Sequence, residues 1–107
     1  MNKNNPQISR LLEDINTNSD KKLTLYSIEG CPACEEFKTK LGKLDIMYDS
    51  VDMENNDPMW EQLKEMGGSE FVPQISIDGN LMKEYNDVND LLSMTISEII
   101  GRKVILK

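Results

Sequence analysis

Two cysteines, Cys31 and Cys34, are the side chains whose type and spacing could carry chemistry in this sequence. A disulfide between them closes a very short loop and removes little entropy from the unfolded chain, which argues against a structural role. In a reducing compartment a Cys-x-x-Cys pair is more often catalytic or metal-binding. Zinc takes four ligands from Cys, His and carboxylates, whereas this chain has two thiols and no histidine. The pair therefore predicts thiol–disulfide chemistry, with no metal bound by this chain alone.

The residues around the pair predict a strand that leads into a helix. Apolar residues alternate through residues 23–28, and Gly30 ends that strand. Residues 35–44 place apolar side chains on one helical face, namely Phe37, Leu41 and Leu44. Pro32 suits the first turn of this helix, where its missing N–H would have no partner.

This context predicts different roles for the two thiols. A free thiol with a pKa of about 8.5 is mostly protonated at neutral pH, but the N–H groups and positive dipole end at a helix start favour the anion. We therefore expect Cys31 to attack a substrate disulfide and Cys34, one helical turn further, to resolve the mixed disulfide. The alternative is that Cys34 is a small buried hydrophobe and Cys31 an incidental neighbour.

The remaining sequence predicts the elements that hold this pair in place. Strands are expected at residues 46–53, 72–77 and 81–85, with a tight hairpin turn at residues 78–80. A helix starting at Asp57-Pro58 carries Trp60, Leu63 and Met66 on one face, and a last helix is capped by Asn86 or Asp87. This order predicts an α/β fold in which a four-stranded mixed sheet is flanked by helices.

Composition limits the classes of partner. The chain has 107 residues, about one domain, and a net charge of −7 from 12 basic and 19 acidic side chains. A protein surface that binds along the phosphates of a nucleic acid needs clustered Lys and Arg, and this sequence has no such cluster. We therefore expect no nucleic-acid partner. No apolar run approaches the roughly 20 residues that span a bilayer, and no signal peptide is visible. We expect a cytoplasmic monomer that is not bound to a membrane.

Two motifs separated by about forty residues carry a resemblance to a known family. They are YSIEGCPAC at residues 26–34 and FVPQISIDG at residues 71–79. Over residues 22–100 the sequence resembles the glutaredoxin branch of the thioredoxin superfamily. The resemblance implies the thioredoxin/glutaredoxin fold, and it implies that Pro73 forms a cis peptide bond facing the cysteines and keeps metals off the thiols.

The resemblance also implies a binding site beside the cysteines. In this family the residue at Val72 lends its backbone to a bound peptide or glutathione, and a polar or acidic pair at Asn86 and Asp87 binds the amino end of glutathione. Pro32, Ala33 and Phe71 complete the implied glutathione or substrate site. Glutathione is thus the expected co-substrate, and no cofactor is expected to stay bound.

Several positions depart from the family pattern. Ile28 stands where many glutaredoxins carry a Lys, Ser69-Glu70 replaces a small basic loop, and Lys83-Glu84 replaces a Gly-Gly pair. The aromatic residue often found between the cysteines is Ala33. Glutathione is a net anion, so losing cationic contacts should weaken its capture, each charge-assisted bond contributing about 1.5–3 kcal/mol.

Outside the resemblance, residues 1–21 are predicted to form a polar arm and residues 22–107 the glutaredoxin-like domain. Within the arm, a helical spacing of apolar residues predicts a short extra N-terminal helix, with Ile8, Leu11, Leu12 and Ile15 on one face. At the other end, Val104–Leu106 is expected to form either a short added strand or an apolar tail over the core.

The predicted function is an electron carrier that reduces protein disulfides, for example in ribonucleotide reductase, or glutathione mixed disulfides. A nearby alternative is a redoxin that receives its electrons from thioredoxin reductase. An alternative of another class is a dimer that holds an iron–sulfur cluster with Cys31 and glutathione as ligands. Ala33 leaves room for a cluster, but Pro32 argues against it, because cluster binders often have Gly there.

Overall fold

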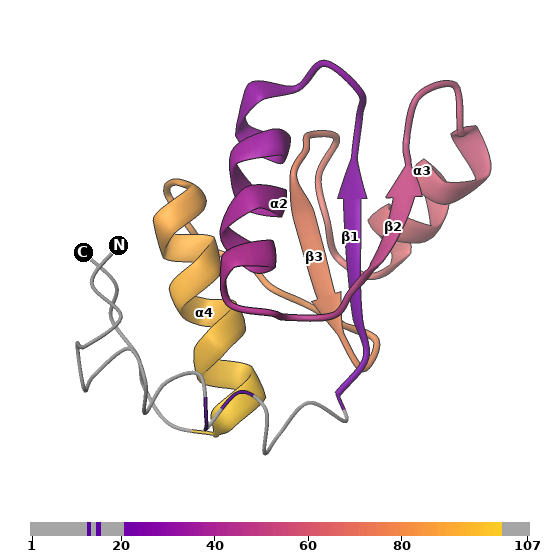
Figure 1. Ribbon diagram of the computed structural model, residues 1–107. Helices are drawn as coiled ribbons and strands as arrows, with labels where there is room; N and C mark the ends of the chain where they lie inside the picture. Colours follow the sequence, from indigo (N-terminus) through magenta and orange to yellow (C-terminus); the bar gives the residue numbers. More distant parts are fainter. Residues whose placement is uncertain (1–12, 14, 16–20, 102–107) are drawn as a thin grey trace.

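Four strands and three helices are described in full by the computed structural model, which describes Glu13, Ile15 and residues 21–101 (Figure 1). The strands are β1 (Leu23–Ser27), β2 (Asp49–Asp52), β3 (Gln74–Ile77) and β4 (Asn80–Leu81). The helices are α2 (Pro32–Lys43), α3 (Asp57–Glu65) and α4 (Val88–Ile100). The order of these elements matches the order predicted from the sequence.

The strands form one mixed sheet in the order β2-β1-β3-β4. β1 pairs in parallel with β2 and antiparallel with β3, and β3 pairs antiparallel with β4. β1 is therefore a central strand, so its carboxyl end is fixed by hydrogen bonds on both sides. The α/β fold with a four-stranded mixed sheet is confirmed.

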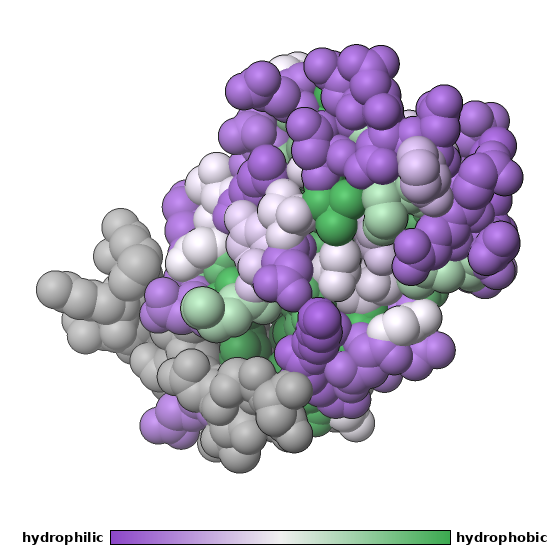
Figure 2. All heavy atoms as spheres, turned by 90° about the vertical axis from the view of Figure 1, so that its right-hand side faces the viewer, coloured by the Kyte–Doolittle hydropathy of each residue, from purple (hydrophilic) through white to green (hydrophobic). Residues whose placement is uncertain are grey.

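Helices cover both faces of the sheet, as the alternation along β1 requires. Leu23 and Leu25 point into the larger core cluster, which α2 and α4 close with Phe37, Leu41, Leu91 and Ile96. Tyr26 points to the opposite face and packs with Leu63 of α3 in a second cluster. Figure 1 shows α2 and α4 side by side and α3 apart from them. Figure 2 shows that the outer surface on the α3 side is mostly hydrophilic.

All four predicted strands are shorter in the structure, the first by a single residue because β1 ends at Ser27. The strand predicted at residues 46–53 is β2 alone, because the chain first closes the end of α2, where the Ile46 N–H donates to the Leu41 carbonyl at 3.0 Å. The strand predicted at residues 72–77 begins at Gln74, since Pro73 has no N–H for the ladder.

The strand predicted at residues 81–85 ends at Leu81. Glu84 has a φ of 66°, which turns the chain out of the sheet direction. Tyr85 consequently leaves the sheet and lies over the segment before β3.

The caps and the termini also bear on the predictions. Of the two residues predicted to cap the last helix, Asp87 does so, accepting a hydrogen bond from the Asp90 N–H at 2.8 Å. Ile15 is 2% exposed and belongs to the larger core cluster. Ile8, Leu11 and Leu12 of the predicted N-terminal helix, and residues 104–106, lie outside the described residues. Within residues 21–101, no helix is long and apolar enough to cross a membrane.

Truncating the core beneath α2 should destabilise the whole fold. Phe37 is fully buried, so Phe37→Ala should lower the free energy of unfolding by about 3–5 kcal/mol, the usual loss for a buried Phe. Met47 is 81% exposed, so Met47→Ala should change it by less than about 0.5 kcal/mol. Urea unfolding of both variants checks this, and equal losses would contradict the core assignment.

Candidate active site

Cys31 is the N-cap residue of α2, with extended backbone angles of φ −84° and ψ 111°. Its carbonyl accepts the first helical hydrogen bond, from the Glu35 N–H at 3.0 Å, and Pro32 occupies the start of the helix. Its Sγ accepts a hydrogen bond from the Cys34 N–H at 3.1 Å. The sulfur thus takes the place of the usual capping oxygen and lies where a helix favours negative charge.

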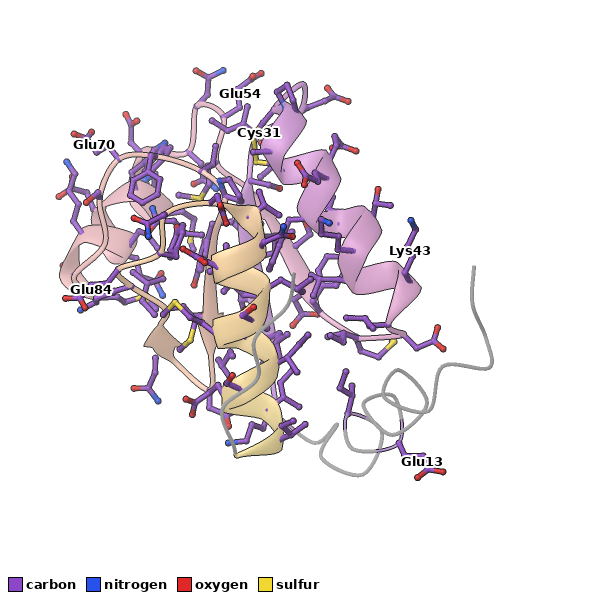
Figure 3. All side chains as sticks on the ribbon, turned by 90° about the vertical axis from the view of Figure 1, so that its left-hand side faces the viewer. Glu13, Cys31, Lys43, Glu54, Glu70 and Glu84 are labelled. Carbon is purple, nitrogen blue, oxygen red and sulfur yellow. A yellow bond between two sulfur atoms is a disulfide. The ribbon has the colours of Figure 1, made fainter. Side chains whose placement is uncertain are left out.

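Cys31 and Cys34 are joined by a disulfide, and their Cα atoms are 5.2 Å apart. Cys34 is fully buried, whereas Cys31 is half-buried. Figure 3 shows Cys31 at the opposite end of α2 from Lys43. Only one of the two sulfurs can therefore meet a bulky substrate, and it is the one at the helix terminus.

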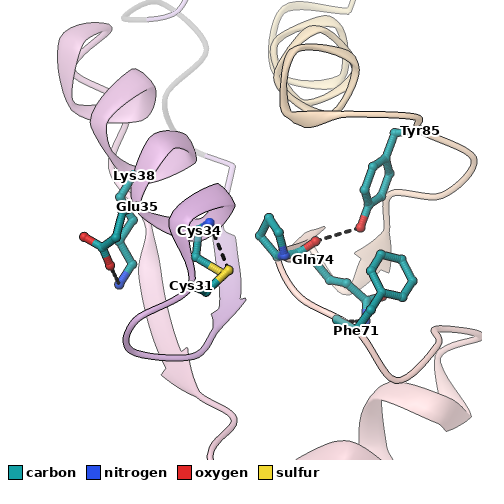
Figure 4. The surroundings of a disulfide bond; sticks show 8 residues. Cys31, Cys34, Glu35, Lys38, Phe71, Gln74 and Tyr85 are labelled. Atoms are coloured by element: carbon teal, nitrogen blue, oxygen red, sulfur yellow. Dashed lines mark hydrogen bonds and ion pairs between the residues drawn. A yellow bond between two sulfur atoms is a disulfide. The ribbon is translucent and has the colours of Figure 1, made fainter.

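The segment before β3 faces this disulfide (Figure 4). The Val72–Pro73 bond is cis, as the resemblance implied. Pro73 is buried and Val72 half-buried. Because Val72 lies outside the β3 ladder, its backbone forms no hydrogen bond with another described residue.

Gln74 holds the segment before β3 in place from the buried side. Its buried side-chain amide donates to the carbonyls of Ser69 and Phe71, each at 2.7 Å. The sequence alone does not predict this role. The sequence feature that could have indicated it is a glutamine placed directly after a proline and next to the apolar residues of a strand.

Tyr85 fixes the same segment from the side of α4. Its hydroxyl donates to the Pro73 carbonyl at 2.7 Å, and its ring lies 6.0 Å from that of Phe71 at 51° (Figure 4). Burial raises the pKa of Tyr85 to about 12. The phenol therefore stays protonated, and able to donate this hydrogen bond, well into the alkaline range. This role was also missed, because the residue was assigned to a strand.

A groove of about 220 Å³ lies between these elements. It brings together six of the predicted site residues, which are Ala33, Phe71, Val72, Pro73, Asn86 and Asp87, with Tyr85, Val88 and Leu91 as further lining. Pro32 is exposed and does not line the groove. The two separated motifs and the start of α4 therefore form one site beside the cysteine pair.

The positions that depart from the family pattern place no cation in this groove. Ile28 packs against the second core cluster. Glu70 forms an ion pair with Lys64 at 3.6 Å, and the ammonium of Lys83 lies against Gly67. Among the described residues that line the groove, Asp87 alone carries a charge.

Comparison with known proteins identifies the family. The model of the glutaredoxin family matches residues 23–82, which is more than half of the chain. The chain belongs to the glutaredoxin family. Glutaredoxin 1 of Rickettsia prowazekii is 31% identical over 58 residues, which cover 52% of this chain and 61% of that protein. A glutaredoxin-like 8.6 kDa protein in the rubredoxin operon of Clostridium pasteurianum is 28% identical over 64 residues, covering 60% and 85%.

Solved glutaredoxin structures share the fold. The glutathione complex of buckwheat glutaredoxin superimposes with a TM-score of 0.58 at 16% identity, covering 91% of this chain and 89% of that one. Oxidized glutaredoxin 2 from Chlamydomonas reinhardtii gives 0.54 at 22% identity, covering 88% and 90%. The sequence match thus spans about three-fifths of the Rickettsia relative, while the fold likeness extends over most of the chain.

The buried phenol of Tyr85 should make stability depend on pH in the alkaline range. Its pKa is raised from 10.0 to about 12 on folding, so its contribution is full below pH 10 and is lost as the pH rises to about 12. Between these values the free energy of unfolding should fall more steeply for the wild type than for Tyr85→Phe. Urea unfolding at several pH values checks this, and parallel curves would show that the phenol is not buried.

Proposed function

We propose that this glutaredoxin-family protein is a thiol–disulfide oxidoreductase that reduces protein disulfides or glutathione mixed disulfides through Cys31 and Cys34. The observation that carries the proposal is the asymmetry of the pair: an accessible sulfur caps α2 and a fully buried sulfur is within bonding reach of it. An exposed attacking thiol and a protected resolving thiol are what a two-step disulfide exchange requires.

In the first step the Cys31 thiolate attacks one sulfur of the substrate disulfide. A bond forms between Cys31 Sγ and that sulfur, the substrate S–S bond breaks, and the other substrate sulfur leaves as a thiolate that takes up a proton. The helix start and the Cys34 N–H stabilise the Cys31 thiolate before attack.

In the second step Cys34, deprotonated, attacks Cys31 Sγ. The bond to the substrate sulfur breaks, the reduced substrate leaves, and the disulfide seen here is formed. The dithiol thus gives two electrons to the substrate. Two molecules of an external thiol such as glutathione, each giving one electron, return the enzyme to its dithiol form and become a disulfide.

The groove residues are proposed to hold the substrate for this exchange. The open peptide groups of Val72 pair with an extended segment, and buried Pro73 and half-buried Ala33 shape the space beside the cysteines. Exposed Pro32 fixes the start of α2 and offers a contact surface outside the groove. In this proposal Asn86 and Asp87 bind the amino end of glutathione.

The described lining of the groove offers no positive charge to the carboxylates of glutathione, which need cationic partners. The lack of a cation favours a second electron donor, thioredoxin reductase, as a specific alternative. Glutathione remains the proposed co-substrate on the strength of Val72, Asn86 and Asp87.

Consumption of NADPH in the presence of glutathione, glutathione reductase and hydroxyethyl disulfide tests the proposed activity. Cys31→Ser should abolish turnover, because the buried Cys34 sulfur cannot reach a substrate. Cys34→Ser should retain only turnover that passes through a glutathione mixed disulfide. Full activity of a folded Cys31→Ser protein would refute the assignment.

The electron donor is tested in a second arm with the same variants. If the wild-type protein is folded but idle with glutathione, thioredoxin reductase and NADPH should reduce its disulfide. Failure of both donors would contradict the proposal.

A further inference from the structure

Phe71 is an exposed aromatic residue that the fold nevertheless holds in place. The residue is 46% exposed. Among the residues that the structure describes, Met47 is the one other large hydrophobic residue that is exposed. Its carbonyl is bound by the buried amide of Gln74, and its ring packs on that of Tyr85. Both constraints fix the position of this ring in the lining of the groove rather than leaving it to move freely.

The partner ring is fixed as well. The Tyr85 hydroxyl is bound to the Pro73 carbonyl, so Phe71, Tyr85 and the proline segment form one preorganised wall of the groove. Figure 4 shows this wall across from the disulfide. A rigid aromatic wall can receive a side chain with little further loss of conformational entropy.

The chemistry of the groove indicates what it can receive. Its floor is apolar, with Val72, Pro73, Val88 and Leu91 among the lining. Its one charged lining residue among the described residues is Asp87, an exposed carboxylate at the start of α4. Such a site complements an apolar side chain with basic neighbours and disfavours an anionic ligand.

We infer that Phe71 is a specificity-determining residue that selects polypeptide disulfides whose cysteine is flanked by apolar and then basic residues. The inference rests on the proposed oxidoreductase function. The occupant is an extended segment of a partner protein: its apolar side chain lies against Phe71 and Tyr85, its backbone pairs with Val72, and a basic side chain approaches the Asp87 carboxylate.

A single-turnover experiment tests the inference without any external reductant. Pre-reduced protein is mixed with short peptides that carry one cysteine as a mixed disulfide with 2-mercaptoethanol, and release of the peptide thiol is followed by chromatography. The peptides are Lys-Leu-Cys-Leu-Lys, Lys-Ser-Cys-Ser-Lys and Glu-Leu-Cys-Leu-Glu. The protein dithiol supplies both electrons, so every peptide is reduced by the same reaction.

The wild-type protein should reduce the Leu/Lys peptide about tenfold faster than the Ser/Lys peptide, the discrimination expected for a partly buried apolar side chain. It should reduce the Leu/Glu peptide several-fold more slowly than the Leu/Lys peptide, with a difference that shrinks as salt is added. Phe71→Ala should bring the Leu-to-Ser ratio close to one. Phe71→Leu should restore part of it, and Met47→Ala should leave it unchanged.

The possible outcomes distinguish the inferred role of Phe71 in specificity from the proposed oxidoreductase function on which it rests. A wild-type protein that reduces all three peptides equally, or a folded Phe71→Ala protein that keeps the preference for Leu, would overturn the inference and leave the oxidoreductase standing. Failure of the reduced wild-type protein to reduce any peptide or hydroxyethyl disulfide would overturn the proposed function itself. A thermal unfolding curve for each variant shows that the fold is retained.

Discussion

The start of α2 is the constraint on which the site depends. β1 lies between two partner strands, so its carboxyl end is fixed, and the chain turns through Gly30 directly into the helix. The first helical N–H groups have no partner within the helix. Cys31 meets this need by accepting a hydrogen bond from the Cys34 N–H. The same geometry that caps the helix leaves one sulfur accessible and buries the other.

The rest of the site depends on a second, independent anchor. The segment that faces the disulfide is held by two side chains, since Gln74 binds its carbonyls from within and Tyr85 binds the Pro73 carbonyl from α4's side. These bonds leave the Val72 backbone open and the ring of Phe71 exposed. Redox chemistry and substrate contact therefore come from two parts of the chain, and the sheet fixes their relative position.

Much of this arrangement could be predicted from the sequence. The period-2 pattern of residues 23–28 and the apolar face of α2 predict the strand and the helix, and the cysteine spacing predicts the chemistry. The cis bond at Pro73 came from the resemblance, because no local pattern distinguishes it from the trans form. The ends of β2 and β4 were placed wrongly, since the turns near Asp45 and Glu84 depend on backbone angles of positive φ that side-chain patterns do not show.

The roles of Gln74 and Tyr85 could not be predicted, because each bonds to backbone groups brought close only by folding. The sequence did indicate that Ile28 and Glu70 replace cationic contacts to glutathione, and the structure shows where these two side chains lie. Ile28 is packed in a core cluster, and Glu70 is paired with Lys64 away from the groove lining.

Selective alkylation tests the central claim, that Cys31 is the accessible nucleophile and Cys34 the protected partner. The protein is reduced, treated briefly with iodoacetamide at neutral pH, and mapped by peptide mass spectrometry. Cys31 should be modified, while Cys34 should remain unmodified until the protein is unfolded, since the Cys34 side chain is fully buried. Modification of Cys34 first, or of both at equal rates, would contradict this claim.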